Sequence, residues 1–243
     1  KTGTVKMKIL LAAINAKYIH SNLAVYSLKS YADSKRKNHN ELRTEIDIGE
    51  YTINQQIDGI LQDIYKRKPD MIGFSCYIWN IQFVLQIARN LIKVLPKTAI
   101  WLGGPEVSYN GKQVLKKETE ITGIMVGEGE ETFCRLATYY IEGAGSLSGI
   151  RGLTYRGEDG RIHETGDAEL PDLDRLPFLY RDPEAFENRI VYYESSRGCP
   201  FRCSYCLSSV ERRVRFRSME LVKKELNIFL EARVPQVKFV DRT

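Results

Sequence analysis

Residues 71–95, MIGFSCYIWNIQFVLQIARNLIKVL, join a short apolar run to a long amphipathic stretch. Met71–Ser75 is mostly apolar and follows Pro69-Asp70, which is typical of a buried strand that starts after a turn. Beyond it, apolar side chains recur at the i, i+3, i+4 and i+7 spacing of one helix face: Ile81, Val84, Leu85, Ala88, Leu91, Ile92 and Leu95. The stretch therefore predicts a buried strand followed closely by a helix.

The same alternation of strand and helix continues on both sides, over residues 7–142. We expect strands at residues 8–13, 43–48, 71–75, 99–102 and 123–126. We expect helices at residues 21–34, 57–64, 81–95, 108–117 and 132–141, with Ser21 as the N-cap of the first. This order predicts an α/β fold: an open parallel sheet of the flavodoxin-like or Rossmann-like kind, covered by helices on both faces.

Glycine, serine and polar residues gather where the expected strands end, at residues 15–20, 75–80, 103–106 and 127–130. In open parallel sheets, ligands bind outside the carboxyl ends of the strands. Gly103 and Gly104 would let the backbone approach a ligand closely. The same residue types also make ordinary strand–helix turns, so both interpretations stay open.

The middle of the chain is irregular. A glycine- and serine-containing break at residues 143–149 precedes a hairpin signal, in which Asp159-Gly160 separates residues 152–156 from 161–164. Residues 165–189, with three prolines, predict a linker.

Three cysteines then follow in the pattern C-x3-C-x2-C: Cys199, Cys203 and Cys206. Three thiolates on so short a loop can converge on one soft metal centre. A [4Fe–4S] cluster held by three cysteines keeps one iron open for another ligand, whereas a structural zinc site requires a fourth protein ligand. No Cys or His follows Cys206, and the nearest upstream histidine is His163, beyond the linker. Half of a zinc ribbon and three unrelated thiols are the alternatives.

With Tyr205 before the last cysteine and an apolar strand in front of the loop, this region resembles the radical S-adenosylmethionine (SAM) enzymes. The resemblance implies a [4Fe–4S] cluster on the three cysteines, with SAM bound at the open iron, and it implies that Tyr205 and Asp241 contribute to cofactor binding. The strand at residues 190–193, the helix at 219–230 capped by Ser218, and the strand at 237–240 form one βαβ unit. In that family this unit begins a partial (β/α) barrel of about 200 residues, so we expect a truncated chain that lacks much of the SAM and substrate pocket and is itself inactive.

The upstream crevice resembles the cobalamin-binding domain that precedes the barrel in one class of these enzymes. Ser75-Cys76-Tyr77 falls at its S-x-L motif, Gly103-Gly104 matches its Gly-Gly turn, and residues 127–130 (GEGE) resemble its glycine–acid loop. The resemblance implies that cobalamin contacts Ser75, Tyr77, Gly103, Gly104, Gly127 and Glu128.

The chain departs from the cobalamin pattern in its first loop. The D-x-H-x-x-G motif with the cobalt-ligating histidine is absent, and His20 stands in a different context, next to the start of a helix. We therefore expect cobalamin to bind without a histidine on its lower face. Tyr77 and Trp79 could cover that face, or they could be packing residues.

We predict three segments: a cobalamin-binding-like domain (1–143), a hairpin and linker (144–189), and the start of a radical SAM domain (190–243). The predicted function is reductive cleavage of SAM to a 5′-deoxyadenosyl radical, with cobalamin-dependent methyl transfer or rearrangement. The alternatives are a tRNA methylthiotransferase-like enzyme and a non-enzymatic corrinoid- or zinc-binding interaction module. The former binds another cluster through three N-terminal cysteines, whereas only Cys76 and Cys134 precede the linker; we expect both to be buried core thiols.

The composition of the chain limits the kinds of partner that we expect. The 243 residues are 43% hydrophobic and 28% charged, as in an ordinary globular protein, and no apolar run is long enough to span a membrane. An odd count of five cysteines argues against a secreted disulfide framework and indicates a cytoplasmic protein. The net charge of +5 gives little support to nucleic-acid binding. The expected partners are a small-molecule or peptide substrate and an electron donor such as flavodoxin or ferredoxin.

Arginines cluster around the cysteine loop: Arg197, Arg202, Arg212, Arg213, Arg215 and Arg217. They could attract the carboxylate of SAM or a phosphate-bearing substrate. They could equally belong to a charge-balanced loop.

Overall fold

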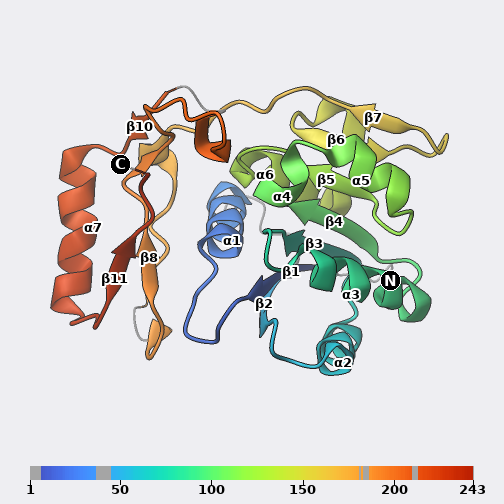
Figure 1. Cartoon of the computed structure of the whole chain (residues 1–243), viewed down its shortest axis with the longest axis horizontal. Helices are drawn as coiled ribbons and strands as arrows, with labels where there is room; N and C mark the ends of the chain where they lie inside the picture. The colour runs from blue at the N-terminus through green and yellow to red at the C-terminus, as the bar shows by residue number, and fades with distance from the viewer. Residues whose placement is uncertain (1–6, 37–44, 181, 183–185, 210–212, 243) are drawn as a thin grey trace, which may run out of the picture.

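The computed structural model describes residues 7–36, 45–180, 182, 186–209 and 213–242, and a seven-stranded sheet is its largest element (Figure 1). The strand order is β2-β1-β3-β4-β5-β6-β7. The parallel strands are β1 (Lys8–Asn15), β2 (Glu45–Thr52), β3 (Met71–Ser75), β4 (Ala99–Gly103) and β5 (Gly123–Met125). The order 2-1-3-4-5 is flavodoxin-like and reverses direction at β1 and β3. The predicted α/β class is confirmed.

Helices cover both faces of the sheet (Figure 1). On one face lie α1 (Leu23–Arg36) and α6 (Glu130–Glu142); on the other lie α2 (Ile57–Arg67), α3 (Ile81–Val94), α4 (Pro105–Ser108) and α5 (Gly111–Lys117). Strand β1 explains this arrangement, because its side chains alternate between the faces. Leu10, Ala12 and Ile14 join the core with α2 and α3. The odd-numbered residues 9, 11 and 13 join the core with α1 and α6.

Two local expectations are wrong. Helix α1 begins at Leu23, so Asn22 and not Ser21 is its N-cap, and the Asn22 Oδ1 accepts from the Val25 amide at 3.3 Å. The helix expected at residues 108–117 is two helices, because Pro105 starts α4 early and residues 109–110 separate it from α5. Residues 43–44, where the second strand was expected to start, lie outside the described residues.

The predicted hairpin forms, but it belongs to the main sheet. Strand β6 (Leu153–Arg156) pairs antiparallel with β5, and β7 (Ile162–Glu164) pairs antiparallel with β6. Leu153 and Tyr155 are buried in the same core as α1 and α6, which explains why the hairpin extends the sheet. The boundary at residue 143 stays a prediction.

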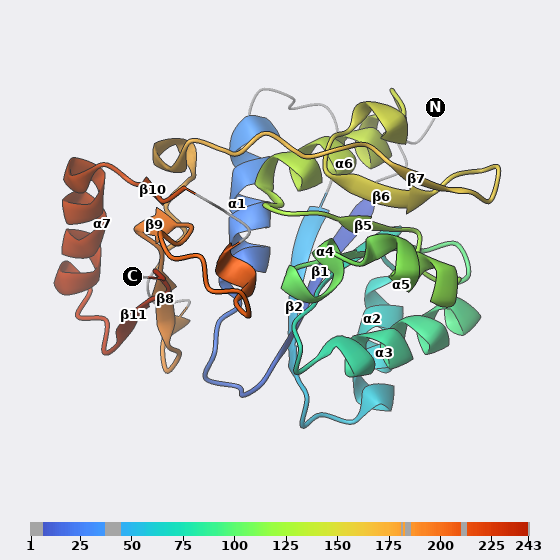
Figure 2. The ribbon, with the colours of Figure 1, turned by 45° about the horizontal axis from the view of Figure 1, so that its top comes forward.

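The predicted βαβ unit lies beside α1 (Figures 1 and 2). Strands β8 (Val191–Tyr193) and β11 (Val237–Phe239) are parallel, and α7 (Met219–Glu231) connects them. The Ser218 side chain caps α7 as expected. The βαβ unit has a core of its own, which contains Tyr180, Phe186, Val191, Tyr193, Val222 and Phe229. The Tyr26 ring of α1 packs edge-on against Phe186, with 5.1 Å between centroids, so α1 contacts both the sheet and this unit.

Shorter elements complete the chain. Turns of 3-10 helix lie at Leu147–Gly149, Leu173–Arg175 and Leu207–Ser209. Strands β9 (Ser196–Arg197) and β10 (Arg215–Phe216) pair antiparallel on either side of the cysteine loop. Sequence patterns did not indicate this pair, because each strand has only two residues.

Candidate functional site

A cavity of about 520 Å³ opens at the carboxyl edge of the main sheet, against the βαβ unit. Six residues predicted to bind a cofactor line it: Ser75, Tyr77, Gly103, Gly104, Gly127 and Glu128. The other wall comes from the cysteine region and the end of the βαβ unit: Glu194, Ser196, Arg197, Gly198, Leu207, Ser208, Val240 and Arg242. The cavity therefore forms only where the two halves of the chain meet.

Asn80 holds the loop between β3 and α3 in place. Its side chain is fully buried, and Nδ2 donates to the Ile14 and Ser75 carbonyls, each at 3.0 Å. Its Oδ1 accepts from the Tyr77 amide at 2.7 Å. The side chain thus ties the ends of β1 and β3 together beneath the cavity. Sequence analysis missed it, although an asparagine directly before a strongly periodic helix is a cap signal.

We expect Asn80→Ala to destabilise the protein by about 2–3 kcal/mol, because a buried amide and two carbonyls lose their partner. Urea unfolding measures the change. Asn90→Ala in α3, which removes only an exposed hydrogen bond from Lys93, is the matched control, expected to stay within about 0.5 kcal/mol. Equal losses in the two variants would contradict this role for Asn80.

The aromatic residues of the same loop stack on each other. The rings of Tyr77 and Trp79 are 4.4 Å apart and inclined by 8°. Tyr77 lines the cavity, and burial raises the pKa of its hydroxyl, while Trp79 is half exposed and does not line the cavity. Tyr77 is thus placed to contact a ligand, with Trp79 behind it.

His20 faces away from the cavity lining and towards the βαβ unit. Its Nδ1 lies 2.5 Å from the Tyr192 hydroxyl, and the two rings stack at 6.0 Å. Residue 20 also forms a parallel bridge with Ile190, and Ser21 Oγ donates to the Ile190 carbonyl at 2.9 Å. His20 therefore contributes to the contact between the halves, and the binding of cobalamin without a histidine on its lower face stays a prediction.

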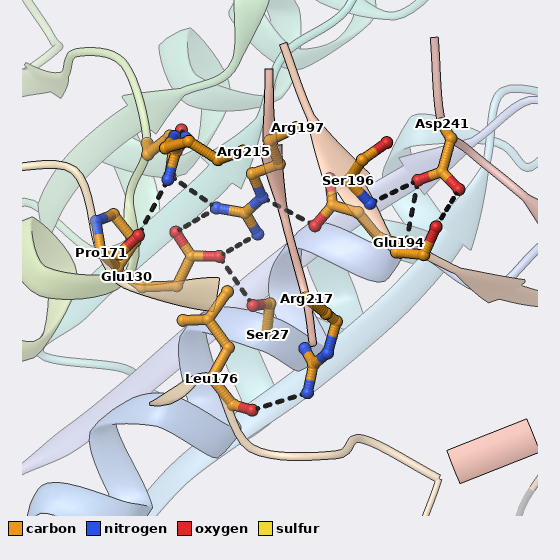
Figure 3. Close-up of polar contacts among 12 residues, drawn as sticks. Ser27, Glu130, Pro171, Leu176, Glu194, Ser196, Arg197, Arg215, Arg217 and Asp241 are labelled. Atoms are coloured by element: carbon orange, nitrogen blue, oxygen red, sulfur yellow. Dashed lines mark hydrogen bonds and ion pairs between the residues drawn. The ribbon is translucent and has the colours of Figure 1, made fainter. Parts of the chain in front are cut away.

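A buried network of charges, drawn in Figure 3, joins the two walls of the cavity. The Arg197 guanidinium, 15% exposed, pairs with Glu128 at 2.8 Å, Glu130 at 2.6 Å and Glu194 at 2.7 Å. Arg215 pairs with Glu128 as well. Glu128 and Glu130 come from the glycine–acid loop, so this loop of the first domain binds to the strand that precedes Cys199.

Electrostatics favour the charged forms of Glu130 and Arg197 in this network. Burial alone would raise the pKa of Glu130, but the Arg197 guanidinium and a hydrogen bond from Ser27 Oγ at 2.8 Å hold it below its usual value. Burial raises the pKa of Glu194, although Arg197 opposes the shift. Burial likewise favours neutral Arg197, but Glu130 and Glu194 raise its pKa. The network is therefore a set of mutually dependent ions.

The remaining arginines divide into two groups. Arg217, like Arg197 and Arg215, is paired: it donates to Glu225 at 2.6 Å and to the Leu176 carbonyl at 3.1 Å. Arg202 and Arg213 are exposed, and Arg212 lies outside the described residues. Three of the six are thus charge-balanced, which favours the second interpretation of the cluster.

Asp241 closes the βαβ unit. Its carboxylate accepts from the Ser195 amide at 2.9 Å, the Ser195 hydroxyl at 2.5 Å and the Ser196 amide at 2.7 Å (Figure 3). Both neighbours of Asp241, Val240 and Arg242, line the cavity. Asp241 holds the loop after β8 in this structure, and its contact with SAM stays a prediction.

The cysteine loop starts where the backbones at the ends of β9 and β10 lie very close together. Gly198 has a φ of +100°, and a Cβ there would lie 2.1 Å from the Arg213 carbonyl oxygen, so the close approach of the β9 and β10 ends requires glycine. Cys199, Cys203 and Cys206 are of intermediate exposure, and none of the three is in a disulfide. Tyr205 is 91% exposed and does not line the cavity.

Sequence spacing predicted convergence of the three thiols. Within the described ranges, however, the structure brings no three or more Cys, His, Asp or Glu side chains into a group that could hold a metal. The thiols suit a soft metal by chemistry and by position in the chain, but their arrangement does not form a ligand set. The pairing of β9 with β10 fixes the two ends of this loop, and within it the Cys206 amide donates to the Cys203 carbonyl at 3.1 Å.

The two cysteines that precede the linker, Cys76 and Cys134, are buried, as predicted for core thiols. Burial raises the pKa of Cys76 to about 12.

Among the helices of the described part of the chain, none has both the length and the apolar character needed to cross a membrane.

Comparison with known proteins identifies the class. The family model of the B12 binding domain matches residues 9–137, which is more than half of the chain. The chain therefore belongs to the B12-binding domain family. The match covers the sheet from β1 to α6 and hence one complete wall of the cavity.

Two relatives named as methyltransferases are longer than this chain. The chain is 29% identical over 211 residues to an uncharacterised methyltransferase of Pyrococcus horikoshii, covering 77% of this chain and 44% of the relative. It is 25% identical over 170 residues to the cobalamin-dependent radical SAM methyltransferase TokK of Streptomyces tokunonensis, covering 63% and 23%. The chain thus spans less than half of the length of these relatives.

A solved structure shows that the fold extends beyond the B12-binding domain. The cobalamin-dependent SAM radical enzyme OxsB, with aqua-cobalamin and SAM bound, superposes with a TM-score of 0.76 at 20% identity. The match covers 98% of this chain and 34% of OxsB. The fold shared with OxsB therefore includes the βαβ unit and the cysteine loop in addition to the main sheet.

Proposed function

We propose that this chain is the cofactor-binding part of a cobalamin-dependent radical SAM enzyme, with methyl transfer as the reaction class. The observation that carries the proposal is the shared cavity: one wall is a B12-binding domain and the other is the start of a domain with a three-cysteine loop. Relatives named as methyltransferases support the choice of methyl transfer over rearrangement.

The sheet edge fits a large planar ligand. Gly103 and Gly104 present backbone without side chains to the cavity, and the space above Gly127 is open, with no atom within 4 Å of the place of a Cβ. Ser75 and Tyr77 add a hydroxyl and an aromatic face. These residues would hold the corrinoid, which supplies a cobalt centre able to carry a methyl group.

The βαβ unit would place a second cofactor on the opposite wall. Cys199, Cys203 and Cys206 supply the thiols for a cluster, and Leu207 and Ser208, directly after them, line the cavity. Because the thiols are not grouped in the described structure, cluster binding requires the loop to rearrange. The residues of this chain would orient both cofactors and exclude water, while the substrate and an electron donor such as flavodoxin or ferredoxin stay unidentified.

Anaerobic purification with added cobalamin tests this proposal, through the visible absorption spectrum together with metal analysis. We expect one corrinoid and about four iron per chain. The matched control replaces Cys199, Cys203 and Cys206 with alanine and should lose the iron while keeping the corrinoid. One zinc per chain in place of iron would instead support a non-enzymatic corrinoid- and zinc-binding module.

A further inference from the structure

Buried ion pairs join the halves of this chain at two places, one at the cavity and one away from it. Arg197 and the acidic loop residues Glu128 and Glu130 line the cavity. Arg189, 20% exposed, pairs with Glu50, 9% exposed, and neither lines the cavity. The two arginines are therefore comparable in burial and in the halves they connect, but only one is at the cavity.

The contacts of Arg197 fix three elements at once. Its Nη1 and Nη2 donate to Glu128 at 2.8 Å and to Glu130 at 2.6 Å, and its Nε donates to Glu194 at 2.7 Å. Glu130 begins α6 and accepts from Ser27 of α1, so the guanidinium is linked to both helices that cover this face. The planar guanidinium of arginine has five N–H donors, so it can bind several carboxylates at once, whereas the compact ammonium of lysine does not suit such a site.

The charges of the network depend on Arg197. Three carboxylates, Glu128, Glu130 and Glu194, face two guanidiniums, Arg197 and Arg215, so the local balance is already one negative charge. Without Arg197, three buried carboxylates would share only Arg215. Such groups repel one another and attract water, which would separate the glycine–acid loop from the β9 strand.

We propose that Arg197 is the positioning residue of the cavity: by binding Glu128 and Glu130, it sets the distance between the corrinoid-binding loop and the cysteine loop. Gly198 follows directly and begins the cysteine loop, so a shift of Arg197 relative to Glu128 and Glu130 changes the spacing of the two walls. The proposed role is thus exerted through the two loops that Arg197 joins. This inference rests on the proposed corrinoid site.

The test compares Arg197→Met with Arg189→Met, using hydroxocobalamin titration and amide hydrogen exchange. We expect Arg197→Met to weaken hydroxocobalamin binding about tenfold or more, since a buried charge network loses its central partner. Arg189→Met should lower the midpoint of thermal unfolding about as much as Arg197→Met does. Its affinity for hydroxocobalamin should stay within about twofold of that of wild type. The hydroxocobalamin affinity of Arg197→Lys should lie between those of wild type and Arg197→Met. If the methionine variant does not fold, the lysine variant takes its place in the comparison with Arg189→Met.

Hydrogen exchange separates this inference from the proposed function, because it needs no ligand. In the unliganded protein, Arg197→Met should speed exchange in residues 127–131 and 196–199, and Arg189→Met should not. Unchanged exchange in Arg197→Met, or equal loss of affinity in both variants, would overturn the role of Arg197. Wild-type protein that binds no hydroxocobalamin would overturn the proposed function, while the exchange comparison would still decide the role of Arg197.

Discussion

Gly104→Ala is expected to destabilise the protein by about 3 kcal/mol, through backbone strain and one hard contact. Gly104 has φ +107° and ψ 174°, a conformation that is essentially reserved for glycine. A Cβ there would lie 2.5 Å from the Cys76 carbonyl oxygen and 3.1 Å from the Cys76 nitrogen. These are backbone atoms that cannot rotate away, because the Cys76 amide also donates to the Gly103 carbonyl at 2.7 Å.

Urea unfolding monitored by circular dichroism measures this loss. Gly143→Ala is the matched control: Gly143 also has a positive φ, +61°, but no atom lies within 4 Å of its Cβ position. We expect this variant to lose only about 1 kcal/mol, from the left-handed conformation alone. Similar losses in the two variants would show that the contact with Cys76 contributes nothing.

Glu225→Ala is expected to cost about 3–5 kcal/mol, because it leaves a buried guanidinium without its anion. The Glu225 side chain in α7 is 3% exposed and accepts from Arg217 and from the Tyr193 hydroxyl, both at 2.6 Å. Arg217 is 8% exposed and its Nε has no partner in the described structure, so without Glu225 the guanidinium would keep the Leu176 carbonyl, a neutral acceptor, and no anion that replaces the carboxylate. The core of the βαβ unit should therefore loosen.

Chemical denaturation with two companion variants checks the cause. The double variant Arg217→Met with Glu225→Leu should regain much of the lost stability, because both charges are removed and apolar side chains fill the space. Asp33→Ala, which breaks the exposed pair with Lys29, should change stability by less than about 0.5 kcal/mol. A loss below about 1 kcal/mol for Glu225→Ala would contradict a buried ion pair.

Local patterns in the sequence were sufficient for the main sheet. The strand at 71–75 has the predicted bounds, and the helix expected at 81–95 ends one residue earlier, because a buried strand and an amphipathic helix each leave a clear periodicity. The crevice followed from topology, since parallel strands end at one edge. Six of the eight predicted cofactor-binding residues line the cavity for this reason.

Contacts between distant segments were not predictable in the same way. The pairing of Arg197 with Glu128 and Glu130 joins residues far apart in the chain, and no periodicity records it. A usable signal was present, because the acidic GEGE loop and the arginines around the cysteines are complementary in charge. The arrangement of the three thiols was also not predictable, because spacing limits their reach but does not fix the loop.

The most direct test of the central claim, that the cavity at the sheet edge binds a corrinoid, is a hydroxocobalamin titration of Gly103→Leu. Gly103 lines the cavity, and a Cβ there would meet Met125 at 3.6 Å, an ordinary contact, so the fold tolerates an added methyl group at this position. We predict one corrinoid per wild-type chain, nearly unchanged binding in the Gly103→Ala control, and at least about tenfold weaker binding in Gly103→Leu. Equal affinity of Gly103→Leu and wild type, or no binding by wild type, would contradict the claim.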